Sequence, residues 1–268
     1  MIVDLHCHSH YSDGSLSPLS LIKLAEENQV EVLSITDHDN VDAYKEIQKI
    51  KTDIKIIPGI EFSTSWNKVG VHIVGINIDT KSNFLVSAIN KQKQTRLIRA
   101  EIIAKRLEKT GLVNALNKIN KNGNIGQIGR PDFAKLLVNE GIAKDWNYAF
   151  KKFLGAGKIG DVKNSWLPLE EVLNSIIQSG GIPVLAHPLY YKMTNSKLKR
   201  LISDFKRMGG QGIEVLNGYQ NPLKTNYLRQ LCKDFGLKAS IGSDFHNPSN
   251  WSKLGCPSSV IMDLEAVW

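Results

Sequence analysis

The sequence predicts an α/β fold, a β/α barrel interrupted by a helical insertion. Strand-like apolar runs alternate with helical segments at both ends of the chain, which is typical of repeated β/α units. The middle of the chain is helical and basic, and it lacks such runs. Short histidine and acid motifs follow the apolar runs. With 268 residues, 42% of them hydrophobic, the chain is long enough to bury one barrel-sized core.

The first barrel segment comprises residues 1–80. One helix is expected to begin at Pro18, with Ser17 as its cap, and to run to about Gln29. A second helix is expected from Asn40 to about Ile50. The expected strands are Ile2–His8, Glu31–Thr36, Lys55–Ser63 and Gly70–Asp79.

Residues 81–163 are expected to form a helical insertion over one end of the barrel, where it acts as a substrate-recognition cap. The apolar residues of Gln92–Lys109 recur at helical spacing, and a second helix is expected over Pro131–Asn139. Between them, Gly123–Gly129 has the composition of a loop.

Residues 164–268 complete the barrel. The expected elements alternate, each helix preceding a strand: Pro168–Ser179, Ile182–Ala186, Ser196–Met208, Gly212–Leu216, Pro222–Phe235 and Lys238–Ile241. Repeated β/α units imply a parallel sheet with right-handed crossovers. Functional side chains are then expected at the carboxyl ends of the strands.

The charge and the cysteines restrict the class of protein. Lysine and arginine number 34 against 26 acidic residues, so the net charge of +8 favours anionic partners. The three cysteines are odd in number and widely separated, so we expect no disulfide framework. No apolar run approaches the ~20 residues of a membrane-spanning helix, and the first residues do not resemble a signal peptide. We expect a cytoplasmic protein with no membrane association and no obligate protein partner.

Six of the seven histidines lie in polar motifs at the ends of strand-like runs, and acids accompany them. His6 and His8 are two residues apart, so both project to one side of an extended strand. Imidazole and carboxylate together bind divalent metals. Taken singly, each motif has an ordinary interpretation as a polar strand end. Their combination predicts a multinuclear metal site and a hydrolase. The residues concerned are His6, His8, Asp13, His38, Glu61, His72, His187, Asp244 and His246.

These motifs resemble those of the polymerase-and-histidinol-phosphatase (PHP) superfamily of metal-dependent phosphoesterases. The similarity is greatest to the branch of ribonuclease AM and the 3′,5′-nucleoside bisphosphate phosphatases. It runs nearly end to end and includes Arg130–Ala134, Phe153–Lys158 and Ser240–His246. The resemblance implies a PHP-type distorted (β/α)7 TIM-like barrel with a helical insertion domain.

The resemblance also implies three divalent ions and their ligands. His6, His8, Glu61 and Asp244 would hold the first ion. Glu61, His72 and His187 would hold the second, and Asp13, His38 and His246 the third. The catalytic residues implied are Asp13, His38, Glu61, His187, Asp244 and His246. Manganese is the first choice, with zinc or iron as alternatives, because the donors are imidazole and carboxylate without thiolate.

Four residues near these ligands receive other roles. Asp4, Asp37 and Asp39 are expected to orient the ligand imidazoles. His10 is expected at the surface. The Cys7 side chain should point away from the two imidazoles beside it.

The resemblance implies a substrate as well: a nucleoside 3′,5′-bisphosphate, or 5′-phosphorylated RNA shortened from its 5′ end, including rRNA 5′-end maturation. Arg130 before a helix start and Lys158 in a glycine-rich stretch are the candidate 5′-phosphate contacts. The chain has Asp132 where members of the family usually have histidine.

Three alternatives stay open. A related phosphatase of the same superfamily would prefer histidinol phosphate. A non-catalytic RNA-binding module would bind RNA in a salt-sensitive way that chelation does not change. A proofreading DNA exonuclease would belong with a polymerase segment.

Overall fold

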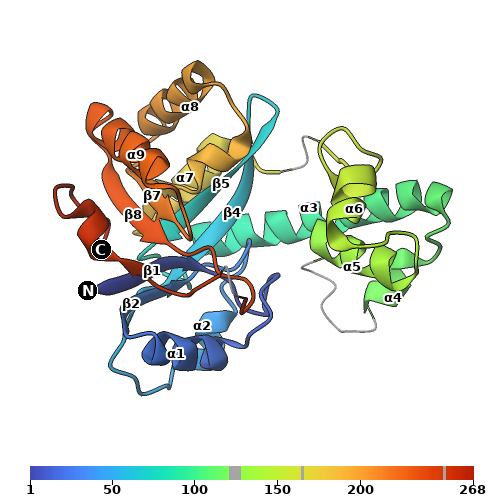
Figure 1. Ribbon diagram of the computed structural model, residues 1–268, viewed down its shortest axis with the longest axis horizontal. Coiled ribbons are helices and arrows are strands. Elements are labelled where there is room, and N and C mark those ends of the chain that lie inside the picture. Colours follow the sequence, from blue (N-terminus) through green and yellow to red (C-terminus); the bar gives the residue numbers. More distant parts are fainter. Residues whose placement is uncertain (121–127, 164–165, 250–251) are drawn as a thin grey trace. The chain divides into compact units, whose positions relative to one another are not determined.

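The structure is a computed structural model that describes residues 1–120, 128–163, 166–249 and 252–268. The chain divides into two compact units (Figure 1). One consists of Met1–Ile89 together with Leu167–Trp268, and the other is Asn90–Trp166. The described strands all belong to the first unit.

A four-stranded sheet contains the amino-terminal strand. Its order is β3-β2-β1-β9, with β1 and β2 parallel, β2 and β3 parallel, and β1 and β9 antiparallel. Ile2 of β1 pairs with Pro257 of β9, so the carboxyl-terminal segment returns to the first strand. The strands are β1 (Ile2–Cys7), β2 (Val30–Ile35), β3 (Lys55–Ile56) and β9 (Cys256–Pro257).

A second, five-stranded sheet has the order β4-β5-β6-β7-β8. Strands β6, β7 and β8 are parallel, as predicted, whereas β5 runs antiparallel to both of its neighbours. The prediction of a parallel sheet is therefore wrong at β4 and β5. The strands are β4 (Gly59–Trp66), β5 (Val69–Ile76), β6 (Ile182–Leu185), β7 (Gly212–Asn217) and β8 (Lys238–Gly242).

A two-residue turn explains the antiparallel pair. Asn67 and Lys68 both have positive φ, 45° and 65°, and Trp66 pairs directly with Val69. Such a turn matches the right-handed twist of two strands and reverses the chain tightly. The predicted strand Lys55–Ser63 is divided for a different reason. Pro58 has no N–H to donate to a ladder, and β3 and β4 on either side of it join different sheets.

The ladders of the described strands form two sheets and not one closed barrel. Single bridges connect the sheets, at or beyond the carboxyl ends of β1, β2 and β8 and near the amino end of β4. Cys7 bridges to Phe245, and His38 bridges to Glu61. The side chains that follow β1, β2 and β8 are thereby brought together with those of β4.

Helices cover the sheets of the first unit (Figure 1). Helices α1 and α2 share a buried apolar cluster with β1 and β2 that includes Leu21, Ile47 and Ile35. Helices α7, α8 and α9 pack against the second sheet through residues such as Ile176 and Phe205. The elements are α1 (Pro18–Glu27), α2 (Ala43–Ile47), α7 (Leu169–Gln178), η4 (Pro188–Tyr191), α8 (Asn195–Arg207), α9 (Pro222–Asp234) and η5 (Ser258–Ile261).

The helix starts largely follow the sequence. Ser17 caps α1 by accepting a hydrogen bond from Ser20 N, as predicted. Helix α2 is shorter than expected. The Asn40 side chain accepts from Asp42 N at 2.9 Å and forms a turn there, so the helix begins three residues later, at Ala43.

The second unit contains helices around its own apolar cluster, which includes Ile103, Phe133 and Leu154. Helix α3 begins in the first unit and contains most of the predicted helix Gln92–Lys109. Helix α5 matches the predicted helix Pro131–Asn139, and most of the predicted loop Gly123–Gly129 lies outside the described residues. The elements are α3 (Asn83–Leu107), η1 (Glu108–Thr110), α4 (Ala115–Asn120), α5 (Arg130–Asn139), α6 (Trp146–Ala149) and one turn of π-helix, η3 (Phe150–Leu154).

Among the described helices, none has the length and apolar run needed to cross a bilayer. Cys7, Cys232 and Cys256 are buried and form no disulfide, as the sequence predicted.

Candidate metal centre

The structure brings all nine predicted ligand residues together in the first unit. They come from segments far apart in the sequence, mostly at or just beyond the carboxyl ends of strands. Pairs of their nitrogen and oxygen atoms, each no more than 3.8 Å apart, connect the nine into one group. We call this group the His/Asp/Glu cluster; it consists of His6, His8, Asp13, His38, Glu61, His72, His187, Asp244 and His246.

Glu61 lies at the centre of the cluster and is fully buried. Its two oxygens divide the surrounding imidazoles between them. Burial alone would raise the pKa of this carboxyl, but the surrounding imidazoles outweigh burial and hold the pKa well below its usual value. Oε1 contacts His6 Nε2 (3.3 Å), His72 Nδ1 (2.8 Å) and His187 Nε2 (3.0 Å), and Oε2 contacts His8 Nε2 (3.3 Å) and His38 Nδ1 (2.9 Å).

The four residues assigned to the first ion have donor atoms that converge. Asp244 Oδ1 lies 3.5 Å from His6 Nε2 and 3.3 Å from His8 Nε2, and Glu61 lies 3.3 Å from each of these nitrogens. His6 Nε2, His8 Nε2, Glu61 Oε2 and Asp244 Oδ1 are buried and make no hydrogen bond of normal geometry. Buried polar atoms are almost always satisfied. Buried, unsatisfied nitrogen and oxygen atoms that face one another fit a shared cation.

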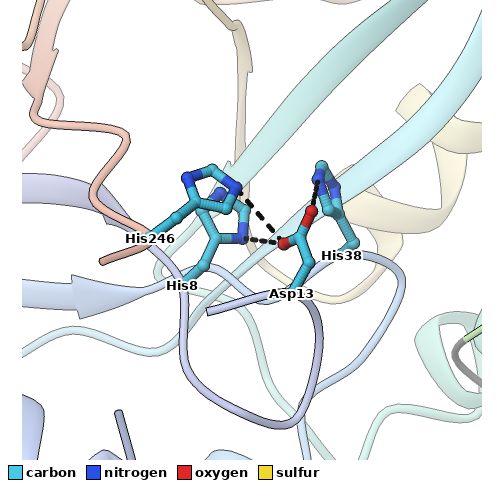
Figure 2. A group of neighbouring side chains, drawn as sticks. All are labelled: His8, Asp13, His38 and His246. Carbon is cyan, nitrogen blue, oxygen red and sulfur yellow. Dashed lines mark ion pairs between the residues drawn. The ribbon is translucent and has the colours of Figure 1, made fainter. Parts of the chain in front are cut away.

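Asp13 organises a second group of four residues (Figure 2). Its Oδ1 lies 3.2 Å from His246 Nε2 and 3.8 Å from His8 Nδ1, and its Oδ2 lies 3.7 Å from His38 Nε2. The carboxylate thus faces three imidazoles from three different segments. This group contains the three residues assigned to the third ion, with His8 added.

The residues assigned to the second ion surround Glu61 Oε1. His72 and His187 approach this oxygen from β5 and from the end of β6. The geometry also groups His38 with Glu61 and His72, whose donor atoms lie within 4.8 Å of one another. His38 therefore faces both the Asp13 carboxylate and the Glu61 carboxylate.

The close approach of β8 to β1 places Asp244 beside His6. Asp244 N donates to His6 O at 2.7 Å. A Cβ atom on Gly242 would lie 2.4 Å from the His6 Cβ, so only glycine permits this approach. Asp244 and His187 also have positive φ, 54° and 26°. Strained backbone of this kind concentrates at functional sites.

Glu214 is a residue of this site that the sequence interpretation missed. It lies on β7, is buried, and its Oε1 is 3.0 Å from His6 Nδ1. Its Oε2 accepts hydrogen bonds from His187 N (2.6 Å) and Asn217 Nδ2 (3.0 Å). An acid inside the apolar run Ile213–Leu216 is the signal that could have identified it, because a buried acid requires partners.

The roles predicted for two neighbouring acids are wrong. Asp4 accepts hydrogen bonds from the backbone amides of His6, Ser243 and Gly255 and so ties β1 to the carboxyl-terminal segment. Asp37 accepts from the Ser9 amide and from two serine hydroxyls. Both carboxylates fix the backbone that carries the ligands and do not orient an imidazole directly.

Asp39 accepts a hydrogen bond from Ser63 N at 2.9 Å and so contacts β4. The Cys7 thiol donates to Ser34 O on the apolar side of β1, as expected. His10 is exposed and stacks on Tyr11, which agrees with the expectation that it is a surface residue.

Burial and the neighbouring charges give the imidazoles of the cluster different pKa values. Burial and, to a lesser extent, the nearby His246 lower the pKa of His8 to about 4. For His246, the Asp13 carboxylate outweighs burial and raises the pKa to about 9. Burial also opposes protonation of His6, but Glu61, Glu214 and Asp244 raise its pKa well above normal. An excess of carboxylate charge around buried imidazoles is what a cation would neutralise.

The two predicted substrate contacts belong to the second unit. Arg130 is the first residue of α5, its Nη1 donates to Leu154 O at 3.4 Å, and burial lowers its pKa. Lys158 is exposed in a turn. Asp132 Oδ2 accepts from Gly129 N at 2.8 Å, so this carboxylate caps the start of α5. Capping gives Asp132 a structural role beside Arg130.

Known proteins resemble the chain over its whole length. A 5′-3′ exoribonuclease of Haemophilus influenzae is 38% identical over 99% of this chain and 97% of its own. A 3′,5′-nucleoside bisphosphate phosphatase of Chromobacterium violaceum is 36% identical over 92% of this chain and 87% of its own. A solved structure described as an amidohydrolase from the same species, with bound sulfate and no metal, has a TM-score of 0.90. It is 34% identical and covers 99% of this chain and 94% of its own. Residues 4–143 match the PHP domain family, and the chain therefore belongs to it.

Proposed function

We propose that this protein is a metal-dependent phosphoesterase. It removes the 3′-phosphate of nucleoside 3′,5′-bisphosphates and shortens 5′-phosphorylated RNA from the 5′ end. The observation that carries this proposal is the convergence of five imidazoles on the Glu61 carboxylate, inside a cluster of nine residues whose buried atoms include unsatisfied ones on His6, His8, Glu61 and Asp244. The full-length similarity to an exoribonuclease and to a bisphosphate phosphatase supports the choice of substrates.

The His/Asp/Glu cluster would hold three divalent ions, with manganese as the first candidate and zinc or iron as alternatives. His6, His8, Glu61 and Asp244 would bind one ion, Glu61, His72 and His187 another, and Asp13, His38 and His246 the third. Bound divalent ions lower the pKa of water and neutralise charge on a phosphoryl group. Imidazoles, carboxylates and the absence of a nearby thiolate fit such ions.

The chain's own residues keep this site in shape. Glu214 holds the His6 ring so that Nε2 faces Glu61 and Asp244. Asp4 fixes the backbone of His6 and Ser243, the residue before Asp244. Burial of His6, His8 and Glu61 keeps water from competing for their donor atoms. Preorganised groups of this kind need little rearrangement when charge develops on the phosphoryl oxygens.

Substrate recognition would require groups outside this cluster. We propose residues 81–163 as the recognition cap, with Arg130 and Lys158 as contacts to the 5′-phosphate. Residues 1–80 and 164–268 would form the distorted (β/α)7 barrel. A guanidinium at a helix start is suited to bidentate binding of a phosphate. Both activities then break the same kind of bond, the one between the 3′ oxygen and phosphorus.

Product analysis tests this proposal. Purified protein is incubated with adenosine 3′,5′-bisphosphate and with 5′-phosphorylated RNA, before and after chelation and on adding back Mn²⁺. We expect AMP and phosphate from the first substrate and mononucleotides from the second, with activity lost on chelation and restored by metal. Asp244→Asn should abolish both reactions with the fold intact. Wild-type rates in this variant would show that the cluster is not the active site.

The same assay separates the alternatives. A faster reaction with histidinol phosphate would indicate a different phosphatase of the family. RNA binding that persists after chelation, without any product, would indicate a non-catalytic binding module. A preference for DNA over RNA would favour a proofreading exonuclease.

A further inference from the structure

A pocket lies directly beside Asp244, outside the group of metal-binding atoms. Its volume is about 290 Å³, and its lining comes from the ends of β7 and β8, from η4 and from the segment before β9. Tyr190, Tyr219, Asn217 and Lys253 line it together with Asp244. All of these residues belong to the first unit. The pocket is at the small end of the range for ligand sites, which suits one ring system.

Two tyrosine rings give the pocket its aromatic character. Tyr219 is 91% exposed, and Tyr190 is 57% exposed. The Tyr190 ring is stacked on the His187 imidazole, with centroids 5.5 Å apart and an angle of 17° between the planes. Tyr190 therefore contacts the His/Asp/Glu cluster and also lines the pocket. A ligand in the pocket would lie next to the proposed metal site.

The backbone that carries Tyr219 is firmly held. Gly218 has φ of +51°, its N–H donates to Gly242 O at 2.9 Å, and a Cβ there would meet Ser243 O at 2.8 Å. Asn217 donates to Glu214 Oε2 at 3.0 Å. The loop after β7 is thus fixed to β8 and to the acid that positions His6. An aromatic ring on a fixed loop loses little entropy on binding a planar partner.

The pocket has few charged side chains, which favours an uncharged portion of the substrate. Among the described lining residues, Lys253 is the basic one and Asp244 faces the proposed metal site, while the others are tyrosines, an asparagine, serines and a glycine. Phosphate sites often contain a bidentate arginine, and the described lining has none. Flat aromatic surface with a few polar groups is instead the chemistry that binds a nucleobase by stacking.

We propose that this pocket binds a nucleobase of the substrate, which stacks on Tyr219. The proposal rests on the proposed function, because only a nucleotide substrate brings a base next to the metal site. The base belongs either to the nucleotide that carries the scissile 3′-phosphate or to the following nucleotide of an RNA. Both sources present the same planar ring, and the choice of substrate separates them.

The test compares substrates with and without a base. Tyr219→Ala and Tyr219→Phe are assayed with adenosine 3′,5′-bisphosphate, with ribose 3,5-bisphosphate and with 5′-phosphorylated RNA. Loss of one stacked base should lower kcat/KM on the order of tenfold, mainly through KM. We expect this loss for Tyr219→Ala with a base-containing substrate, no change with ribose 3,5-bisphosphate, and near wild-type values for Tyr219→Phe.

A surface residue outside the pocket provides the matched control. Met262, 82% exposed and outside the pocket, is replaced in Met262→Ala and should behave as wild type. A loss with both base-containing substrates assigns the base of the scissile nucleotide, and a loss with RNA alone assigns the next one. An equal loss with ribose 3,5-bisphosphate, or no loss with any substrate, would overturn the proposal. If wild-type protein hydrolyses none of the three, the proposed function itself fails.

Discussion

Glu214 and His6 form a buried pair in which Glu214 Oε1 lies 3.0 Å from Nδ1 of the imidazole. The opposite ring nitrogen, Nε2, faces Glu61 and Asp244. A carboxylate on one ring nitrogen fixes the tautomer and makes the other nitrogen a better metal donor. The same carboxylate holds the backbone of His187 through Oε2, so one side chain positions two proposed ligands.

Glu214→Gln should therefore weaken metal binding. The amide loses the negative charge beside His6, and it cannot accept from both His6 and His187 N as the carboxylate does. We expect the affinity for Mn²⁺ to fall roughly 10- to 100-fold. Metal titration of the variant checks this, with Glu265→Gln as control because Glu265 is an exposed acid paired with Lys238. Unchanged affinity in Glu214→Gln would remove the positioning role.

Arg130→Ala should discriminate between substrates by their 5′ end. If its guanidinium binds the 5′-phosphate, the variant should lose more activity on 5′-phosphorylated RNA than on the same RNA with a 5′-hydroxyl. A kinetic comparison of the two substrates measures this difference. Lys135→Ala, which replaces an exposed basic residue of the same helix, is the control. Equal losses on both substrates would leave Arg130 without this role.

Asp132→Ala should destabilise the second unit. The variant loses the acceptor for Gly129 N at the start of α5, and removal of a helix cap costs about 1 kcal/mol. Asp132→Asn keeps an acceptor oxygen and should retain most of the stability. Denaturant unfolding of the full chain gives the two free energies of unfolding. If the two variants have the same stability as wild type, the hydrogen bond to Gly129 does not support the helix.

Asp263 connects the carboxyl-terminal segment to α9 by ion pairs with Arg229 and with Lys233, the latter at 2.5 Å. Hydrogen bonds from Lys233 and Arg229 lower its pKa from 3.8 to about 2. A lowered carboxyl pKa stabilises the fold above about pH 3.8, and this contribution disappears as pH falls through 2. Asp263→Asn should slightly lower Tm at neutral pH, and the difference should shrink with added salt and below pH 2. A Tm difference that is independent of pH would contradict the ion pairs.

The residues of the His/Asp/Glu cluster could be predicted because each lies in a short polar motif within or just after a strand-like run. His6 and His8 follow the alternation of β1, and Asp13 and Asp244 lie in the segments that follow β1 and β8. The strand β5 was predicted, but its antiparallel direction was not, because its turn, Asn67-Lys68, lacks the glycine that usually marks a tight hairpin. Glu214 was missed because its role depends on contacts with His6 and His187, which no local pattern contains.

The division of the strands into two sheets could not be predicted, because it too depends on contacts between residues distant in sequence. Strand periodicity indicates that Lys55–Ile56 and Gly59–Trp66 are extended, but it does not say which neighbour each one pairs with. The pairing is decided by packing between residues distant in sequence, such as the approach of Gly242 to His6.

The metal content of the purified protein after equilibration with Mn²⁺, measured beside Glu61→Gln, decides whether the cluster is a metal centre. Glu61 contacts five imidazoles, so the neutral amide should bind fewer ions than the carboxylate. We predict three ions per chain for the wild type and a clear reduction for Glu61→Gln. A wild-type protein without stoichiometric metal, or a variant that retains all of it, would contradict a metal centre built on Glu61.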